Sequence, residues 1–68
     1  MSEQEVFKRL QRIASEFGYR VTIYADYVNV MRDSRIQDGK SWANFTRSQH
    51  GYERAIAWLQ AKAQRGEL

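Results

Sequence analysis

The stretch YRVTIYADYVNVM (residues 19–31) decides the fold, because its aliphatic residues alternate with polar and aromatic ones instead of following a helical period. This alternation predicts two short strands. Ala25 and Asp26 form the turn between them, although neither is the Gly or Asn that two-residue hairpin turns favour. The aliphatic positions, which share one face of the hairpin, are Val21, Ile23, Val28 and Val30.

A helix is predicted before the hairpin. Ser2 and Glu5 have the spacing of a capping box at its start, and Gly18 has the position of a left-handed cap at its end. Its apolar residues recur at helical spacing and form one stripe. The stripe consists of Val6, Phe7, Leu10, Ile13, Ala14 and Phe17.

A polar loop, a third strand and a second helix are predicted after the hairpin. Residues 33–40 (DSRIQDGK) have the composition of a loop, and residues 41–46 (SWANFT) alternate again as a strand. Ser48 caps a second helix that runs to about Gln64, before Gly66. The core stripe of this helix consists of Tyr52, Ala55, Ile56, Leu59 and Ala63.

The order α-β-β-β-α predicts an α+β fold with a single domain over residues 1–68. Both helices must lie on one face of a small antiparallel sheet to bury their stripes, which gives a two-layer sandwich. A chain of 68 residues has a marginal core, and it contains no cysteine for a disulfide. Self-association as a homodimer is the expected reinforcement.

The composition argues against several functions. Without cysteine, and with the single His50, the chain offers neither a thiolate nor a histidine-cluster metal site, and we expect no cofactor. Titratable groups are not clustered by spacing, so we expect no enzyme. No apolar stretch approaches the roughly 20 residues of a membrane span, and the beginning lacks the features of a signal peptide. The expected location is the cytoplasm, and a net charge of +3 permits an acidic or nucleic-acid partner.

The face of the sheet turned away from the helices is the candidate binding surface. If the aliphatic positions face the helices, this other face is aromatic, polar and nearly free of acids, which is typical of protein contact centres. The alternative is that the aromatic residues merely cap the edges of a thin core, because strands favour Tyr and Trp. The predicted partner-binding residues are Arg20, Tyr24, Tyr27, Met31, Arg32, Arg35 and Trp42.

A second candidate surface lies on the second helix, which is apolar nearly all round. Ala57 and Ala61 lie opposite its core stripe, with Trp58 on the flank, and small residues permit a close symmetric contact. These residues are the predicted dimer interface. The alternative is that the alanines are present only as good helix formers.

Nucleic-acid binding is the alternative function. The α-β-β-β-α order resembles that of double-stranded-RNA-binding domains, but that family has a lysine-rich start to its second helix, where this chain has residues 48–53 (SQHGYE). This departure puts phosphate binding in doubt. A single strand could instead stack its bases on the sheet aromatics, with Arg20 and Arg32 on phosphates.

The plan of the whole chain resembles small accessory proteins of bacteriophages, of the anti-CRISPR or quorum-sensing anti-activator type. The resemblance lies in a capped first helix, a hairpin containing YADYVNV and a closing helix that ends in WLQAKAQ. The resemblance implies a non-catalytic inhibitor that occludes the surface of a host regulator or nucleic-acid-handling protein in the cytoplasm of a bacterial host cell. It assigns no individual residue. A structural subunit of a larger assembly is a third possibility.

Overall fold

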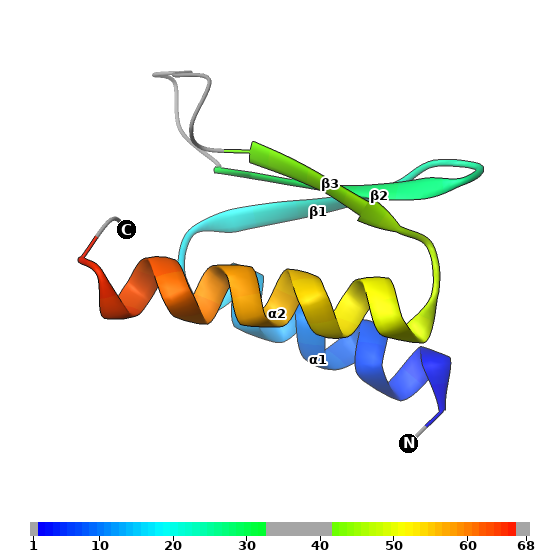
Figure 1. Cartoon of the computed structure of the whole chain (residues 1–68), viewed down its shortest axis with the longest axis horizontal. Helices are drawn as coiled ribbons and strands as arrows, with labels where there is room; N and C mark the ends of the chain where they lie inside the picture. The colour runs from blue at the N-terminus through cyan, green and yellow to red at the C-terminus, as the bar shows by residue number, and fades with distance from the viewer. Residues whose placement is uncertain (1, 33–41, 67–68) are drawn as a thin grey trace.

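The computed structural model describes residues 2–32 and 42–66. The elements are α1 (Glu3–Glu16), β1 (Tyr19–Ile23), β2 (Tyr27–Arg32), β3 (Trp42–Thr46) and α2 (Gln49–Gln64). The prediction of an α+β fold in the order α-β-β-β-α is therefore confirmed (Figure 1). The loop predicted at residues 33–40, including Arg35, lies outside the described residues.

The molecule has two layers. The strands form an antiparallel sheet in the order β1-β2-β3, and both helices cover the same face of it (Figure 1). α1 packs against β1 and α2 against β3, while the helices also pack against each other. Since both helices run in the same direction, their first turns and the β1–β2 turn gather at one end of the molecule.

The ends of the helices follow from side chains that satisfy free backbone groups. The Ser2 hydroxyl accepts a hydrogen bond from the Glu5 N–H at 3.2 Å, and the Ser48 hydroxyl accepts one from the Gly51 N–H at 3.1 Å. α1 ends before Gly18, whose φ of 77° lies in the left-handed region that favours glycine. The predicted caps of both helices are confirmed.

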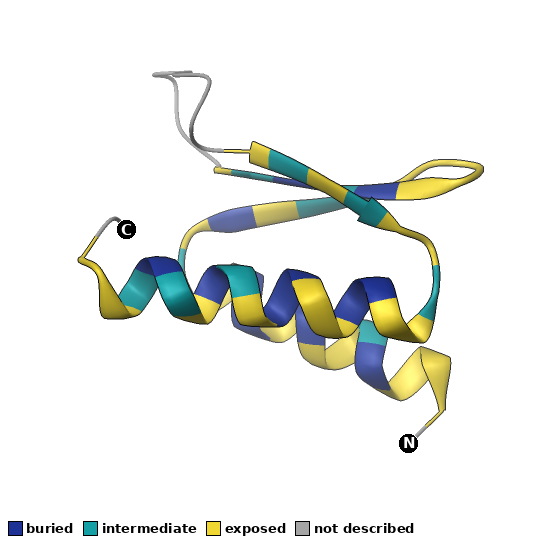
Figure 2. Ribbon diagram, in the orientation of Figure 1, coloured by how far each residue is buried: buried dark blue, intermediate teal, exposed yellow. Residues whose placement is uncertain are grey.

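The core lies between the sheet and the two helix stripes. Figure 2 shows the buried residues of α2 on the side of the helix that faces the sheet. The stripe predicted for α1 is confirmed, with Phe7 and Phe17 half-buried at its margins. The buried hydrophobic residues are Val6, Leu10, Ile13, Ala14, Tyr19, Val28, Val30, Tyr52, Ala55, Ile56 and Leu59.

The last turn of α2 differs from the prediction. Lys62 is buried there, whereas Ala63 is only half-buried. The Lys62 ammonium nitrogen lies 4.9 Å from the centre of the Trp58 ring, a distance suited to a cation–π interaction. The long aliphatic stem of lysine can extend the apolar stripe while its charged end finds an aromatic face.

The pairing of the strands confirms which residues face the helices. Val21 pairs with Val30 and Ile23 with Val28, so all four side chains lie on the helix side. Coverage by the helices is uneven, however, and Ile23 remains 42% exposed. Ile23 therefore faces the helices, as the alternation predicts, but is only partly covered because it ends β1 at the edge of the helix layer.

The β1–β2 turn is stabilised by hydrogen bonds from Arg47, a residue outside the hairpin. Tyr24 N–H donates to the Tyr27 carbonyl at 2.9 Å and closes the hairpin. No described residue other than glycine has a positive φ, so Ala25-Asp26 is not one of the primed turns that fit hairpins best. Arg47 compensates: its N–H donates to the Asp26 carbonyl at 3.4 Å, and its Nη1 donates to the Tyr24 carbonyl at 3.3 Å.

Candidate functional site

The sheet face turned away from the helices is called the open face below. Cross-strand register places its side chains in rows: Arg20, Met31 and Trp42 form one row, and Thr22, Asn29 and Asn44 the next. Tyr27 and Thr46 form the last row, next to Tyr24 at the turn. The alternation of the strands therefore predicted this face correctly.

Tyr24 and Tyr27 form a stacked pair at the turn end of the open face. Their ring centres lie 4.8 Å apart, and the ring planes differ by 16°. The two side chains remain 46% and 40% exposed. Because each ring supports the other and the hairpin fixes their backbones, the pair offers a rigid aromatic surface to a partner.

Trp42 lies at the opposite end of the open face. Its side chain is 48% exposed and stands beside Met31, which is half-buried. Arg20 completes this row on β1. The row combines an indole, a thioether and a guanidinium, three groups that are enriched at the centres of protein interfaces.

The centre of the open face is polar and uncharged. Asn29 Nδ2 donates a hydrogen bond to Asn44 Oδ1 at 2.9 Å across β2 and β3. Thr22 is the neighbour of Asn29 on β1. The remaining amide groups can form hydrogen bonds with a partner. This row can therefore orient a partner that packs against the aromatic rows on either side.

Two of the predicted partner-binding arginines, Arg32 and Arg35, are not among the described residues of the open face. Arg32 pairs with Tyr19, whose side chain is buried under the helices, so Arg32 belongs to the helix side of the sheet. If Arg32 contacts a partner, it does so from the other side of the sheet, since it is one residue out of phase with Met31. Arg35 lies outside the described residues.

The predicted dimer surface on α2 is divided between solvent and core. Ala57 is exposed and Ala61 half-buried, in keeping with their place opposite the core stripe. Trp58 is also half-buried, and its indole meets the rings of Tyr19 and Phe45 edge-on, with centres 5.7 Å and 5.9 Å away. Much of the Trp58 ring is thus engaged within its own chain.

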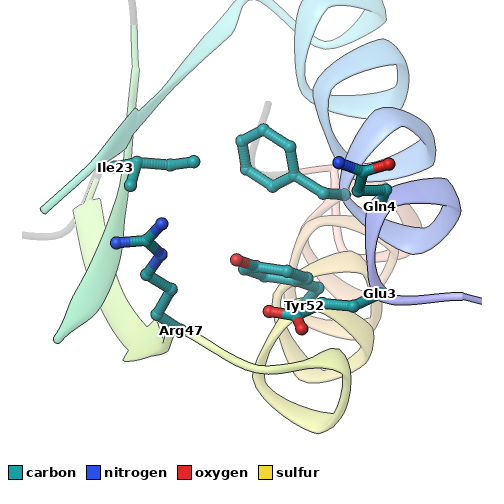
Figure 3. A pocket seen from close by; sticks show the side chains of 6 residues that line it. Glu3, Gln4, Ile23, Arg47 and Tyr52 are labelled. Atoms are coloured by element: carbon teal, nitrogen blue, oxygen red, sulfur yellow. The ribbon is translucent and has the colours of Figure 1, made fainter. Parts of the chain in front are cut away.

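A cleft at the end where both helices begin was missed by the sequence analysis. It has a volume of about 330 Å³ and lies on the helix side of the sheet (Figure 3). Residues from three separate segments form it, and only the folded arrangement brings them together. The lining residues are Glu3, Gln4, Phe7, Ile23, Arg47 and Tyr52.

Within residues 2–32 and 42–66, no group of three or more His, Asp or Glu side chains is placed to hold a metal ion. No helix in these two ranges is long and apolar enough to cross a membrane.

A scan against models of known protein families, a search of curated proteins and a search of solved structures each find no match to this chain. The open face and the cleft are therefore the features from which a function can be inferred.

Proposed function

We propose that the protein is a non-catalytic binding protein that covers a surface of a protein partner with its open face. The observation that supports this proposal is the exposure of Tyr24, Tyr27 and Trp42, between 40% and 48%, on a sheet face. The three strands as described carry no acidic side chain on that face. An exposed apolar surface of this kind costs solubility and brings a small fold no stability, which favours a role in binding.

The layout of the open face suits a protein surface. The row of Trp42 and the row of Tyr27 are four residues apart along β3, which corresponds to about 13 Å in a strand. Two aromatic anchors at this spacing, with hydrogen-bonding amides between them, can bind two apolar pockets in a partner. Truncating either anchor should cost about 2 kcal/mol or more of binding free energy.

The distribution of charge favours protein over nucleic acid. On the described part of the open face, Arg20 is the one charged side chain, because Arg32 lies on the helix side. Proteins that bind nucleic acid neutralise several phosphates at once, which requires several cations on one surface. A face with a single arginine is better suited to steering and pairing with an acid on a protein.

The nature of the partner is proposed from the plan of the chain. Its likeness to small phage accessory proteins of the anti-CRISPR or anti-activator type suggests a bacterial host protein, either a regulator or a nucleic-acid-handling protein. Inhibition would then follow from occlusion, because a partner covered by the open face cannot use the same surface for its own ligand. This mechanism requires no catalytic group and no cofactor.

The test is affinity capture from a nuclease-treated bacterial lysate with three versions of the chain. The unaltered protein should retain a discrete host protein, Trp42→Thr should lose it, and Gln60→Ala on the outer side of α2 should keep it. Threonine preserves strand propensity, so loss of capture reports on the indole. A protein that Trp42→Thr captures equally well would contradict binding through the open face.

Binding of a single nucleic-acid strand is the alternative, and the stacked tyrosines favour it. Bases can stack on the rings of Tyr24, Tyr27 and Trp42 whatever their sequence. This function predicts that an oligonucleotide binds with an affinity that falls steeply as salt is added, because bound counterions are released. Capture that disappears after nuclease treatment would favour this alternative.

A further inference from the structure

We propose that the cleft at the helix-start end binds a small zwitterion with an apolar side chain, the class to which free apolar α-amino acids belong. The cleft lies on the helix side of the sheet, so the inference does not rest on the function proposed for the open face. Three features of its lining support this proposal: a tyrosine hydroxyl that faces the cleft, a pair of opposite charges and an exposed aliphatic wall.

The hydroxyl that faces the cleft belongs to Tyr52. This residue is only 3% exposed, and its ring packs against Phe7 with centres 5.1 Å apart. Its hydroxyl points into the cleft (Figure 3). Among the residues that the structure describes, none forms a hydrogen bond with this hydroxyl. Because it has no partner within the described part of the fold, this hydroxyl is available to form a hydrogen bond with a ligand in the cleft.

The opposite charges are those of Arg47 and Glu3. Arg47 reaches the cleft from the end of β3 and Glu3 from the first turn of α1, with Tyr52 between them (Figure 3). Within the described residues the two do not form an ion pair with each other. Arg47 uses Nη1 for the turn carbonyls, but a guanidinium has five N–H donors, so others remain for a carboxylate. Glu3 can accept an ammonium group.

The start of α2 adds to the preference for a carboxylate on the Arg47 side. α2 begins at Gln49, directly after the turn that contains Arg47, and the N-terminal end of a helix carries partial positive charge. The carboxylate of the ligand would therefore bond to Arg47 and the Tyr52 hydroxyl, and its ammonium to Glu3.

The aliphatic wall explains the size and the apolar side chain of the ligand. Ile23 is 42% exposed here and lines the cleft together with Phe7. A ligand side chain between the two would cover apolar surface that the fold leaves in water. The volume of about 330 Å³ is near the lower limit of small-molecule sites, roughly 300 Å³, which suits a single amino acid.

The experiment is an NMR titration of the intact chain with L-leucine, isocaproate and isoamylamine, which share one aliphatic body. Isocaproate lacks the ammonium group and isoamylamine lacks the carboxylate. L-Leucine should produce saturable shifts at the Ile23 methyls and the Tyr52 ring in the millimolar range. Each partial ligand should bind about tenfold more weakly, because one charge-assisted hydrogen bond is lost. Absence of saturable shifts with L-leucine would overturn the proposal.

Two variants assign the contacts. Tyr52→Phe keeps the ring against Phe7 and should weaken both L-leucine and isocaproate about tenfold. Glu3→Gln should weaken L-leucine by a similar factor but leave isocaproate unchanged, which also shows that the cleft is intact. The open-face variant Trp42→Thr should bind L-leucine as the unaltered protein does. Glu3→Gln that binds L-leucine at full affinity would overturn recognition of a zwitterion.

Discussion

Ile23 and Val28 are direct partners across β1 and β2, yet their surroundings differ. Ile23 is 42% exposed at the cleft, whereas Val28 is fully buried. We therefore expect Ile23→Ser to lower the free energy of unfolding by about 1 kcal/mol, and Val28→Ser by about 3 kcal/mol, since the second change also buries a hydroxyl. Urea unfolding of the two variants measures the difference. Equal losses would mean that Ile23 is covered by the helices in solution.

Gly51 sets the distance between α2 and β3. It is buried in the first turn of α2, and a Cβ built there would overlap the carbonyl oxygen of Thr46. Replacing a glycine within a helix by alanine normally stabilises it by about 1 kcal/mol. Here the neighbour is backbone and cannot rotate away, so Gly51→Ala should instead destabilise by about 1–3 kcal/mol.

Thermal unfolding of Gly51→Ala, compared with the pair Glu53→Ala and Glu53→Gly at an exposed position of the same helix, separates the two effects. The difference within the Glu53 pair gives the intrinsic helix preference alone, about 1 kcal/mol. If Gly51→Ala were more stable than the unaltered protein, α2 would be free to move away from β3.

At the level of the elements, the β1–β2 hairpin depends on Arg47. Two bonds from Arg47 reach the carbonyls of Tyr24 and Asp26, and a third, to Ala25, is 3.5 Å long. Arg47→Ala keeps the backbone bond and removes the guanidinium, which should cost about 1 kcal/mol because the site is exposed. Arg47→Lys should recover only part, since an ammonium lacks the fork of donors.

Urea unfolding measures the loss for both Arg47 variants. The ring signals of Tyr24 and Tyr27 in an NMR spectrum provide a local readout, since loosening the turn should separate the stacked pair. Unchanged ring signals together with unchanged stability would show that the turn holds without the guanidinium.

The sequence predicts the elements well because their signals are local. Ser2, Gly18 and Ser48 act within one turn of their own helix, and alternation fixes which side each strand residue faces. Alternation does not predict how much of the sheet the two helices cover. That is why Ile23 faces the helices but stays exposed, and why Lys62 rather than Ala63 completes the stripe of α2.

The two candidate sites differ in how far they can be predicted. The open face comes from three strands with one period, so residues such as Tyr27 and Trp42 could be placed from the sequence. The cleft joins the first turn of α1, the end of β1 and the start of α2. Distances between such segments depend on how the helix layer packs on the sheet. No local pattern in the sequence predicts these distances.

At the level of the whole molecule, a single layer of two helices on three strands leaves a small core, and a homodimer through α2 is the expected reinforcement. Ala61→Arg places a long charged side chain in that contact, so it should yield monomers in light scattering of the purified protein. Gln60→Ala, on the neighbouring part of the same helix, is the control. A dimer that survives Ala61→Arg would exclude the contact through Ala57 and Ala61.

The order β1-β2-β3 means that each strand pairs with its neighbour in the chain. Such pairings close short loops and lose little chain entropy, so the sheet can form early as the protein is synthesised. The helix layer is different, because α2 is made last and packs on both β3 and α1. Until α2 emerges from the ribosome, the aliphatic side of the sheet is covered by α1 alone, and this is the interval in which a nascent chain is most open to proteases and chaperones.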